Sequence, residues 1–191
     1  MLHLDTRKAL QAAAMLLKQA PGRQMPYLQL LKLLYIADRE SLRETMRPVL
    51  GGRVVAMSKG PLHSKVYDLI KGQGEDASLW SHFIRLDEYD AELADDPGDS
   101  ELSDYEVELL CRIARDYGRL TEWELVELTH RFAEWAKNYP DPNEKTSRRI
   151  HLSDILDAVG LHDDTKAILT AIRKEGQDDA GFRGLPANTH S

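Results

Sequence analysis

The stretch from Pro26 to Ile36 constrains the fold of this chain more than any other part of the sequence. Its apolar residues surround the predicted helix on nearly every side, and they are Tyr27, Leu28, Leu30, Leu31, Leu33, Leu34, Tyr35 and Ile36. Proline is well accepted in a first helical turn, so the helix is expected to begin near Pro26. A helix that is apolar all round has to be covered all round. We therefore expect this helix to lie at the centre of a globular core.

The continuation of this helix is polar, yet it carries one carboxylate on the buried side. Asp38 lies seven residues after Leu31 and four after Leu34, and therefore on the same face. A buried charge needs a partner. We expect an ion pair or a cap with a nearby arginine.

Amphipathic spacing and end signals predict further helices around the central one. Two of them begin with the S/T-x-x-E capping box, formed by Ser103 with Glu106 and by Thr121 with Glu124. Pro61 is expected to open another helix, which Gly72 closes. The expected helices cover residues 6–18, 26–44, 62–71, 103–118, 121–132, 153–159 and 164–174.

Short strands are predicted between the helices. Residues 53–57 form a short run with β-branched side chains between two turn signals, Gly51-Gly52 and Gly60-Pro61. Between Trp80 and Leu93 the apolar period becomes two, which predicts two strands or one hairpin. The expected fold class is therefore α+β and predominantly α-helical, with about six to seven helices and one small antiparallel sheet of about three strands.

Length and composition favour one soluble domain. The chain has 191 residues, of which 42% are hydrophobic and 30% charged, so it can bury a core. We expect a single domain over residues 1–175 and a flexible, polar tail over 176–191. No apolar run approaches the length needed to span a bilayer, and the single cysteine, Cys111, cannot form an internal disulfide. These features favour a cytoplasmic protein without a membrane segment.

The net charge of −7 disfavours nucleic-acid binding, because such binding needs a basic field that releases counterions. A local basic group, Lys145, Arg148 and Arg149, could oppose this average. We interpret that group as a solvated face of the protein.

A search for chemistry yields no catalytic, cofactor or metal site. The sequence has no nucleophile elbow, phosphate-binding loop or metal-binding helix motif. His130 and Glu134 share a helical face, but a metal would need a third ligand at a matching spacing. We expect the His130 ring to pack beside Trp135 and Cys111 to act as a small buried hydrophobe.

Three blocks of residues follow one another along the chain. The first is Leu30 to Ala37 followed by Asp38-Arg39. The second is Val54 to Met57 with Lys59-Gly60-Pro61 and Val66-Tyr67-Asp68, and the third is Leu102-Ser103 with Tyr117-Gly118, Glu124-Leu125, Leu128-Thr129-His130 and Trp135. In this order the blocks resemble the Panacea domain, a phage-associated family, over about residues 5 to 137. Many members of that family carry His-Gly where this chain has Asp38-Arg39.

The resemblance implies an antitoxin of a toxin–antitoxin or phage-defence system, which binds and neutralises a toxin protein encoded by a neighbouring gene. Such a role needs no catalytic residue. Neutralisation could occlude the toxin, distort it or deliver it to a protease or chaperone. The alternatives are a proteolytic adaptor or regulatory module for a non-toxin client, a hydrolase or nuclease built on His130 and Glu134, and a DNA-binding autorepressor, which the acidity disfavours.

Two sets of residues are candidates for binding the partner. The first set consists of aromatic residues that we expect to be exposed, because protein interfaces are enriched in aromatic side chains: Tyr27, Trp80, Phe83, Tyr89 and Trp123. Phe83 is our first choice because the strand period places it opposite Trp80, Ile84 and Leu86, so it would face outward unless helices cover both faces of the sheet. The second set consists of positions in the family-like blocks, most of which we expect to hold the fold. Together the candidates are Tyr27, Asp38, Arg39, Lys59, Tyr67, Trp80, Phe83, Tyr89, Trp123 and His130.

Overall fold

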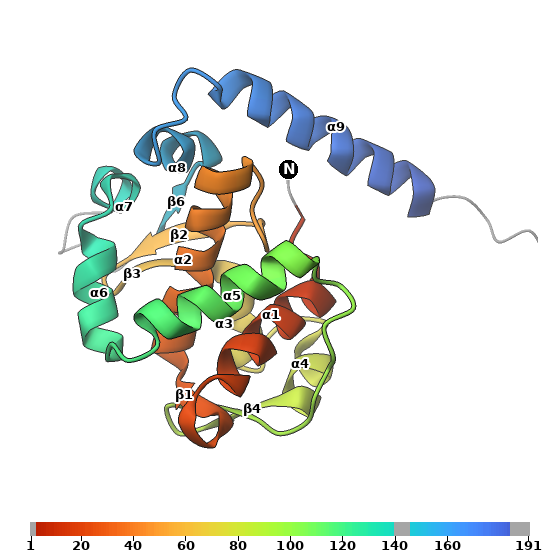
Figure 1. Ribbon diagram of the computed structural model, residues 1–191, viewed down its shortest axis with the longest axis vertical. Helices are drawn as coiled ribbons and strands as arrows, with labels where there is room; N and C mark the ends of the chain where they lie inside the picture. Colours follow the sequence, from red (N-terminus) through yellow and green to blue (C-terminus); the bar gives the residue numbers. More distant parts are fainter. Residues whose placement is uncertain (1–2, 140–145, 184–191) are drawn as a thin grey trace, which may run out of the picture.

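The computed structural model of the protein describes residues 3–139 and 146–183 (Figure 1). Within them the fold is α+β and mostly helical, as expected, with nine α-helices and two small antiparallel sheets. The helices are α1 (Thr6–Lys18), α2 (Tyr27–Thr45), α3 (Ser64–Ile70), α4 (Ala77–Phe83), α5 (Asp104–Tyr117), α6 (Glu122–His130), α7 (Ala133–Asn138), α8 (Leu152–Ala158) and α9 (Thr165–Arg183). The strands are β1 (Gln24–Pro26), β2 (Val54–Met57), β3 (Gly60–His63), β4 (Ile84–Asp87), β5 (Asp90–Leu93) and β6 (Arg148–Ile150).

Helix α2 is the central helix, as its apolar sequence predicts. Leu30, Leu33 and Leu34 have no exposed surface, and the helix packs against α1, α5, α6 and β3. In Figure 1, α5 passes in front of α2 and α1 lies beside it. Both predicted capping boxes form, with Ser103 at the start of α5 and Thr121 at the start of α6.

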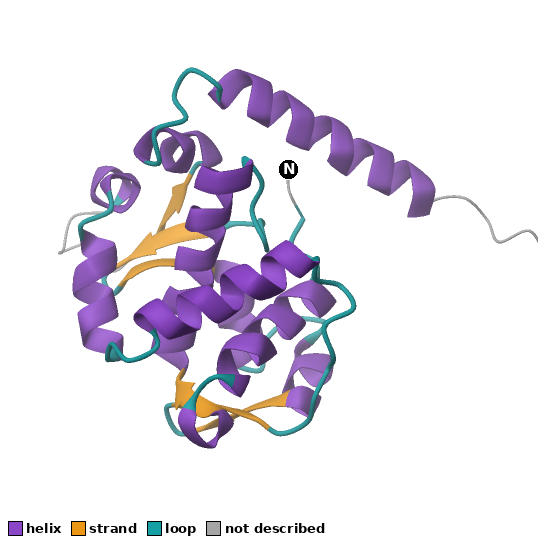
Figure 2. Ribbon diagram, viewed as in Figure 1, coloured by secondary structure: helices purple, strands orange, loops and turns teal. Residues whose placement is uncertain are grey.

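The strands form two three-stranded sheets, with the orders β1-β5-β4 and β3-β2-β6, where the sequence suggested one sheet. Figure 2 shows the sheets well apart, one at the lower end of α2 and one beside its upper half. Strands β1 and β6 have three residues each and pair with strands far along the chain, so a local pattern does not reveal them.

The helix expected from Pro61 begins three residues later, because Gly60–His63 forms the edge strand β3. An edge strand tolerates proline, since one of its sides needs no N–H donor. Residues Trp80 to Phe83, expected to be a strand, belong to helix α4. Trp80 and Ile84 are four residues apart, so the apolar pattern fits a helix turn as well as a strand.

The C-terminal segment adds a second apolar cluster beside the main core. β6 pairs with β2, and Ile155 from α8 and Ile168 and Ile172 from α9 pack in the cluster that also holds Tyr35 of α2. Helix α9 continues to Arg183, past the expected start of the tail at residue 176, and its far half projects from the body in Figure 1. The rest of the expected tail, 184–191, lies outside the described residues.

Candidate functional site

A pocket of about 490 Å³ lies where the second half of α2 meets the C-terminal segment. Tyr35, Asp38 and Arg39 of α2 line it on one side. The opposite wall comes from β6, α8 and α9 and includes Arg149 and Arg173. The polar second half of α2 thus supplies the side chains of a pocket, although its first half is core.

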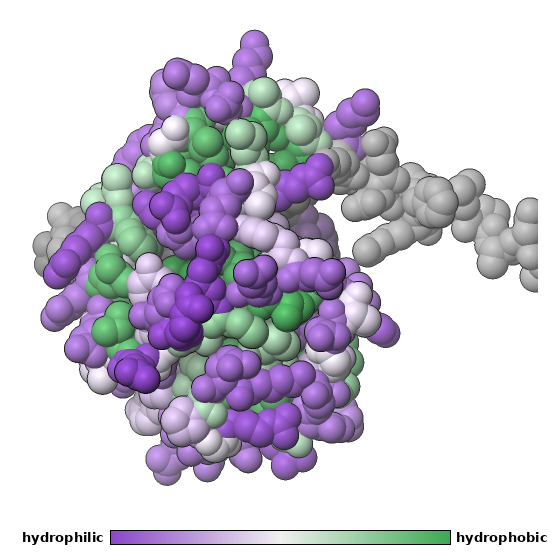
Figure 3. Space-filling view, in the orientation of Figure 1, coloured by the Kyte–Doolittle hydropathy of each residue, from purple (hydrophilic) through white to green (hydrophobic). Residues whose placement is uncertain are grey.

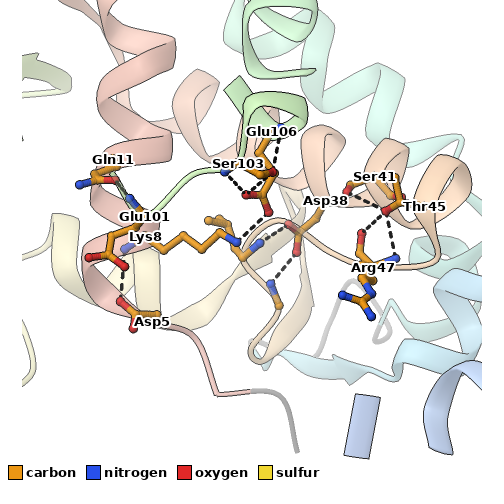
Figure 4. Close-up of polar contacts among 12 residues, drawn as sticks. Asp5, Lys8, Gln11, Asp38, Ser41, Thr45, Arg47, Glu101, Ser103 and Glu106 are labelled. Atoms are coloured by element: carbon orange, nitrogen blue, oxygen red, sulfur yellow. Dashed lines mark hydrogen bonds and ion pairs between the residues drawn. The ribbon is translucent and has the colours of Figure 1, made fainter. Parts of the chain in front are cut away.

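Asp38 holds the loop that follows α2. Its side chain is buried, as predicted, but its partners are the backbone N–H groups of Leu50, at 2.6 Å, and Gly51, at 3.0 Å (Figure 4). The expectation of an arginine partner was therefore wrong. Burial raises the pKa of the Asp38 carboxyl above its usual value, while His63 and the backbone N–H groups oppose that rise.

His63, at the end of β3, is the nearest side chain to this carboxylate. Its Nε2 lies 3.4 Å from Asp38 Oδ2, which is an ion-pair distance, but the alignment is not that of a hydrogen bond. The ring is fully buried, and neither of its nitrogens has a hydrogen-bond partner. Sequence reasoning missed this residue, because a histidine after Gly-Pro-Leu carries no signal of burial.

Glu134 of α7 ties α7 to α2. Its buried Oε1 accepts a hydrogen bond from the Tyr35 hydroxyl, at 2.8 Å, and another from Arg39 Nε, at 2.9 Å. The Arg39 guanidinium also lies 4.2 Å from the centre of the Phe132 ring. Burial and the adjacent Glu134 charge raise the pKa of Tyr35 well above its usual value. Arg39 is thus held in place at the edge of the pocket.

Lys32 is another buried polar group on α2, and it does not line the pocket. It has no exposed surface, and its Nζ donates a hydrogen bond to the Pro61 carbonyl, at 2.7 Å. Burial lowers the pKa of Lys32 to about 7. Gly60, with φ of +92°, leaves room for this amine, since a Cβ there would lie 3.1 Å from Nζ and 2.6 Å from Thr129 Oγ1.

Arg149 and Arg173 bring positive charge to the C-terminal wall. The sequence placed Arg149 in a solvated basic face, but it is half-buried, and its Nε is buried without a hydrogen-bond partner. Arg148 is exposed, and Lys145 lies outside the described residues. Arg173, on exposed α9 surface, lines the same pocket.

The other predicted site residues do not gather at this pocket. Tyr89, at the β4–β5 turn, and Trp123, on α6, are 73% and 55% exposed, and their role in binding a partner stays a prediction. Lys59 is exposed, with Nζ 4.9 Å from the centre of the Trp123 ring. Tyr27 is half-buried, and Lys71 Nζ lies 3.8 Å from the centre of its ring.

Three aromatic candidates on α3 and α4 are not free surface groups. Trp80 is 1% exposed and packs in the main core, so it was wrongly placed on the surface. Phe83 ends α4 instead of lying outward on a strand, and it is half-buried against the same core. Tyr67 on α3 is also half-buried there.

His130 packs as expected. Its ring stacks on Trp135, with 3.8 Å between ring centres, and burial lowers the pKa of the imidazole. Glu134, four residues on, instead bonds Tyr35 and Arg39. No group of three or more metal-binding side chains occurs in the part of the chain that the structure describes.

A family model described as "Antitoxin SocA-like, Panacea domain" matches residues 30–136. The chain belongs to this family. No curated protein and no solved structure matches it. The matched Panacea region contains most of α2, the β2–β3 hairpin and α3 to α6, whereas β6, α8 and α9 follow it. One wall of the pocket is therefore Panacea domain, and the other is a segment outside the match.

Among the described helices, none is long and apolar enough to cross a membrane.

Proposed function

We propose that this protein is an antitoxin that binds a toxin protein encoded by a neighbouring gene and neutralises it by direct contact in the cytoplasm. The observation that carries the proposal is the family match over residues 30–136, which suggests an antitoxin role. Direct contact requires a surface that can bind another protein, and the described residues include exposed side chains suited to this.

Two features of the surface support binding. Tyr89, Trp123 and Met46 are the large apolar side chains that stand exposed in the described part of the chain. Aromatic side chains and methionine are enriched at protein interfaces, and tryptophan in particular carries binding energy there. Lys59 Nζ lies 4.9 Å from the centre of the Trp123 ring, so the two exposed side chains form one patch.

Coexpression tests the proposal. The neighbouring gene should stop growth when expressed alone, and this protein should restore growth and copurify with the product at a defined ratio. A variant with a disrupted core, Leu33→Asp, is the matched control, because it should lose both rescue and copurification. Growth arrest that persists despite abundant folded protein, or rescue without a complex, would contradict neutralisation by direct binding.

A further inference from the structure

The pocket between α2 and the C-terminal segment combines apolar walls with a cationic rim. Leu42 and Val54 line it from the Panacea region, and Ile155, Leu169 and Ile172 line it from α8 and α9. Three arginines, Arg39, Arg149 and Arg173, line the same space. Its volume of about 490 Å³ is typical of sites that enclose part of a ligand.

Two of the three arginines have no acidic partner within the described residues. Arg39 is engaged by Glu134. Neither Arg149 nor Arg173 forms an ion pair there, and the buried Nε of Arg149 has no hydrogen-bond acceptor among the same residues. A buried donor without a partner is unfavourable, so this guanidinium can bind an acceptor that the described residues do not supply.

The carboxylates near the pocket do not accept a hydrogen bond from Arg149. Asp38 already accepts two backbone hydrogen bonds and faces His63, and Glu134 accepts from Tyr35 and Arg39. The protein as a whole carries a net charge of −7, so the cationic rim is a local feature that opposes the average. It would attract an acidic group that the rest of the surface repels.

The surroundings of the pocket suit an elongated ligand. A second hollow of about 450 Å³ shares Ser153, Leu169 and Arg173 with it, so the two meet along α8 and α9. Figure 3 shows hydrophobic side chains among hydrophilic ones over this region, at the top of the view. Asp157 and Asp163 line the second hollow and would repel an acidic group there. The acidic part of a ligand therefore fits the first pocket better.

We propose that this pocket is the docking site for an acidic segment of the toxin, whose carboxylates bind Arg149 and Arg173 while aliphatic side chains next to them fill the apolar space. The proposal rests on the antitoxin function proposed above. Guanidinium groups bind carboxylates through two parallel hydrogen bonds, which gives both strength and orientation. Because Arg149, Arg173 and the α8–α9 wall lie outside the matched family region, this segment would determine which toxin is bound.

The test measures the affinity of the full-length wild type and of its variants for the purified product of the neighbouring gene. In Arg149→Gln/Arg173→Gln we expect the Kd to rise about tenfold or more, and its dependence on salt to become weaker. The matched control, Arg7→Gln/Arg85→Gln, removes two exposed arginines elsewhere and should bind like wild type. Arg149→Lys/Arg173→Lys keeps the charge and should retain more affinity than the glutamine pair. Circular dichroism confirms that every variant is folded.

The outcomes separate the two proposals. If the wild-type protein does not bind the neighbouring product, the proposed function fails and this inference with it. If the wild type binds and the Arg149→Gln/Arg173→Gln variant binds equally well, the pocket is not the docking site, although the antitoxin function stands. A third outcome would also overturn the inference. If inorganic phosphate stabilises the wild type but not Arg149→Gln/Arg173→Gln, and both proteins bind the toxin with the same affinity, the pocket is a site for small anions.

Discussion

Replacing the buried Lys32 by methionine should stabilise the protein at neutral pH. The lysine amine has a pKa of about 7 in the folded protein, compared with 10.5 when it is exposed. At 1.36 kcal/mol for each pKa unit, the difference corresponds to about 5 kcal/mol of cost for burying the charge, and about 4 kcal/mol of this cost remains at pH 7. Methionine avoids it but leaves the Pro61 carbonyl without its donor, which costs about 1–3 kcal/mol. The net expectation is a gain of about 1–3 kcal/mol.

The pH dependence is the sharper part of this prediction. Between pH 7 and pH 10.5 the unfolded chain holds the Lys32 proton and the folded protein has released it, so this residue makes stability rise with pH. The wild type should gain about 2 kcal/mol from it between pH 7 and pH 9. Lys32→Met has no amine to titrate at this position. The amount by which its free energy of unfolding exceeds that of the wild type should therefore shrink by the same amount between pH 7 and pH 9.

Urea unfolding at pH 7, 8 and 9, followed by tryptophan fluorescence, measures both proteins under identical conditions. Other titrating groups cancel in the difference between them. Lys166→Met, at an exposed position, is the control and should show no such change with pH. A constant difference between Lys32→Met and the wild type from pH 7 to 9 would refute the reasoning, since the amine would then be charged in both states.

Three further substitutions have defined outcomes. Asp38→Ala leaves the buried N–H groups of Leu50 and Gly51 without an acceptor and should lower the free energy of unfolding by about 2–5 kcal/mol in urea titrations, whereas a loss below about 1 kcal/mol would mean that water replaces the carboxylate. Thr121→Ala removes a helix cap and should cost about 1 kcal/mol by the same method, with an unchanged midpoint as the contrary result. Trp123→Ala should change stability by less than about 0.5 kcal/mol yet weaken binding of the neighbouring toxin about tenfold, and calorimetry showing wild-type affinity would remove this residue from the interface.

The parts of the fold that local patterns encode were predictable. The apolar ring of α2 indicates a central helix, and the capping boxes at Ser103 and Thr121 mark the true starts of α5 and α6. The hairpin of β4 and β5 follows from its alternation. Each of these features depends on residues within a few positions of one another, which is the range that sequence periodicity reports.

The candidate site depends on distant pairings, and most of it could not be predicted. Asp38 was correctly expected to be buried, but its acceptor role toward the loop of Leu50 depends on how the chain turns after α2. Arg149 reaches the pocket because β6 pairs with β2, and two adjacent arginines give no strand signal. Lys32 was not predicted to be a buried amine, although it is a single charge within an apolar run and that contrast was the available sign.

The division of the pocket between two segments has a consequence for how this protein could vary. The main core, centred on Leu30 and Leu34 of α2, lies within the matched Panacea region. The wall that carries Arg149 and Arg173 follows that region and contacts it mainly through β6 and the second apolar cluster. Substitutions at the half-buried Arg149 and the exposed Arg173 can therefore change the charge of this wall without disturbing the main core, because core packing resists change whereas partly exposed side chains tolerate it. In the proposed antitoxin, the main core and the two arginines that select the partner thus belong to different segments of the chain.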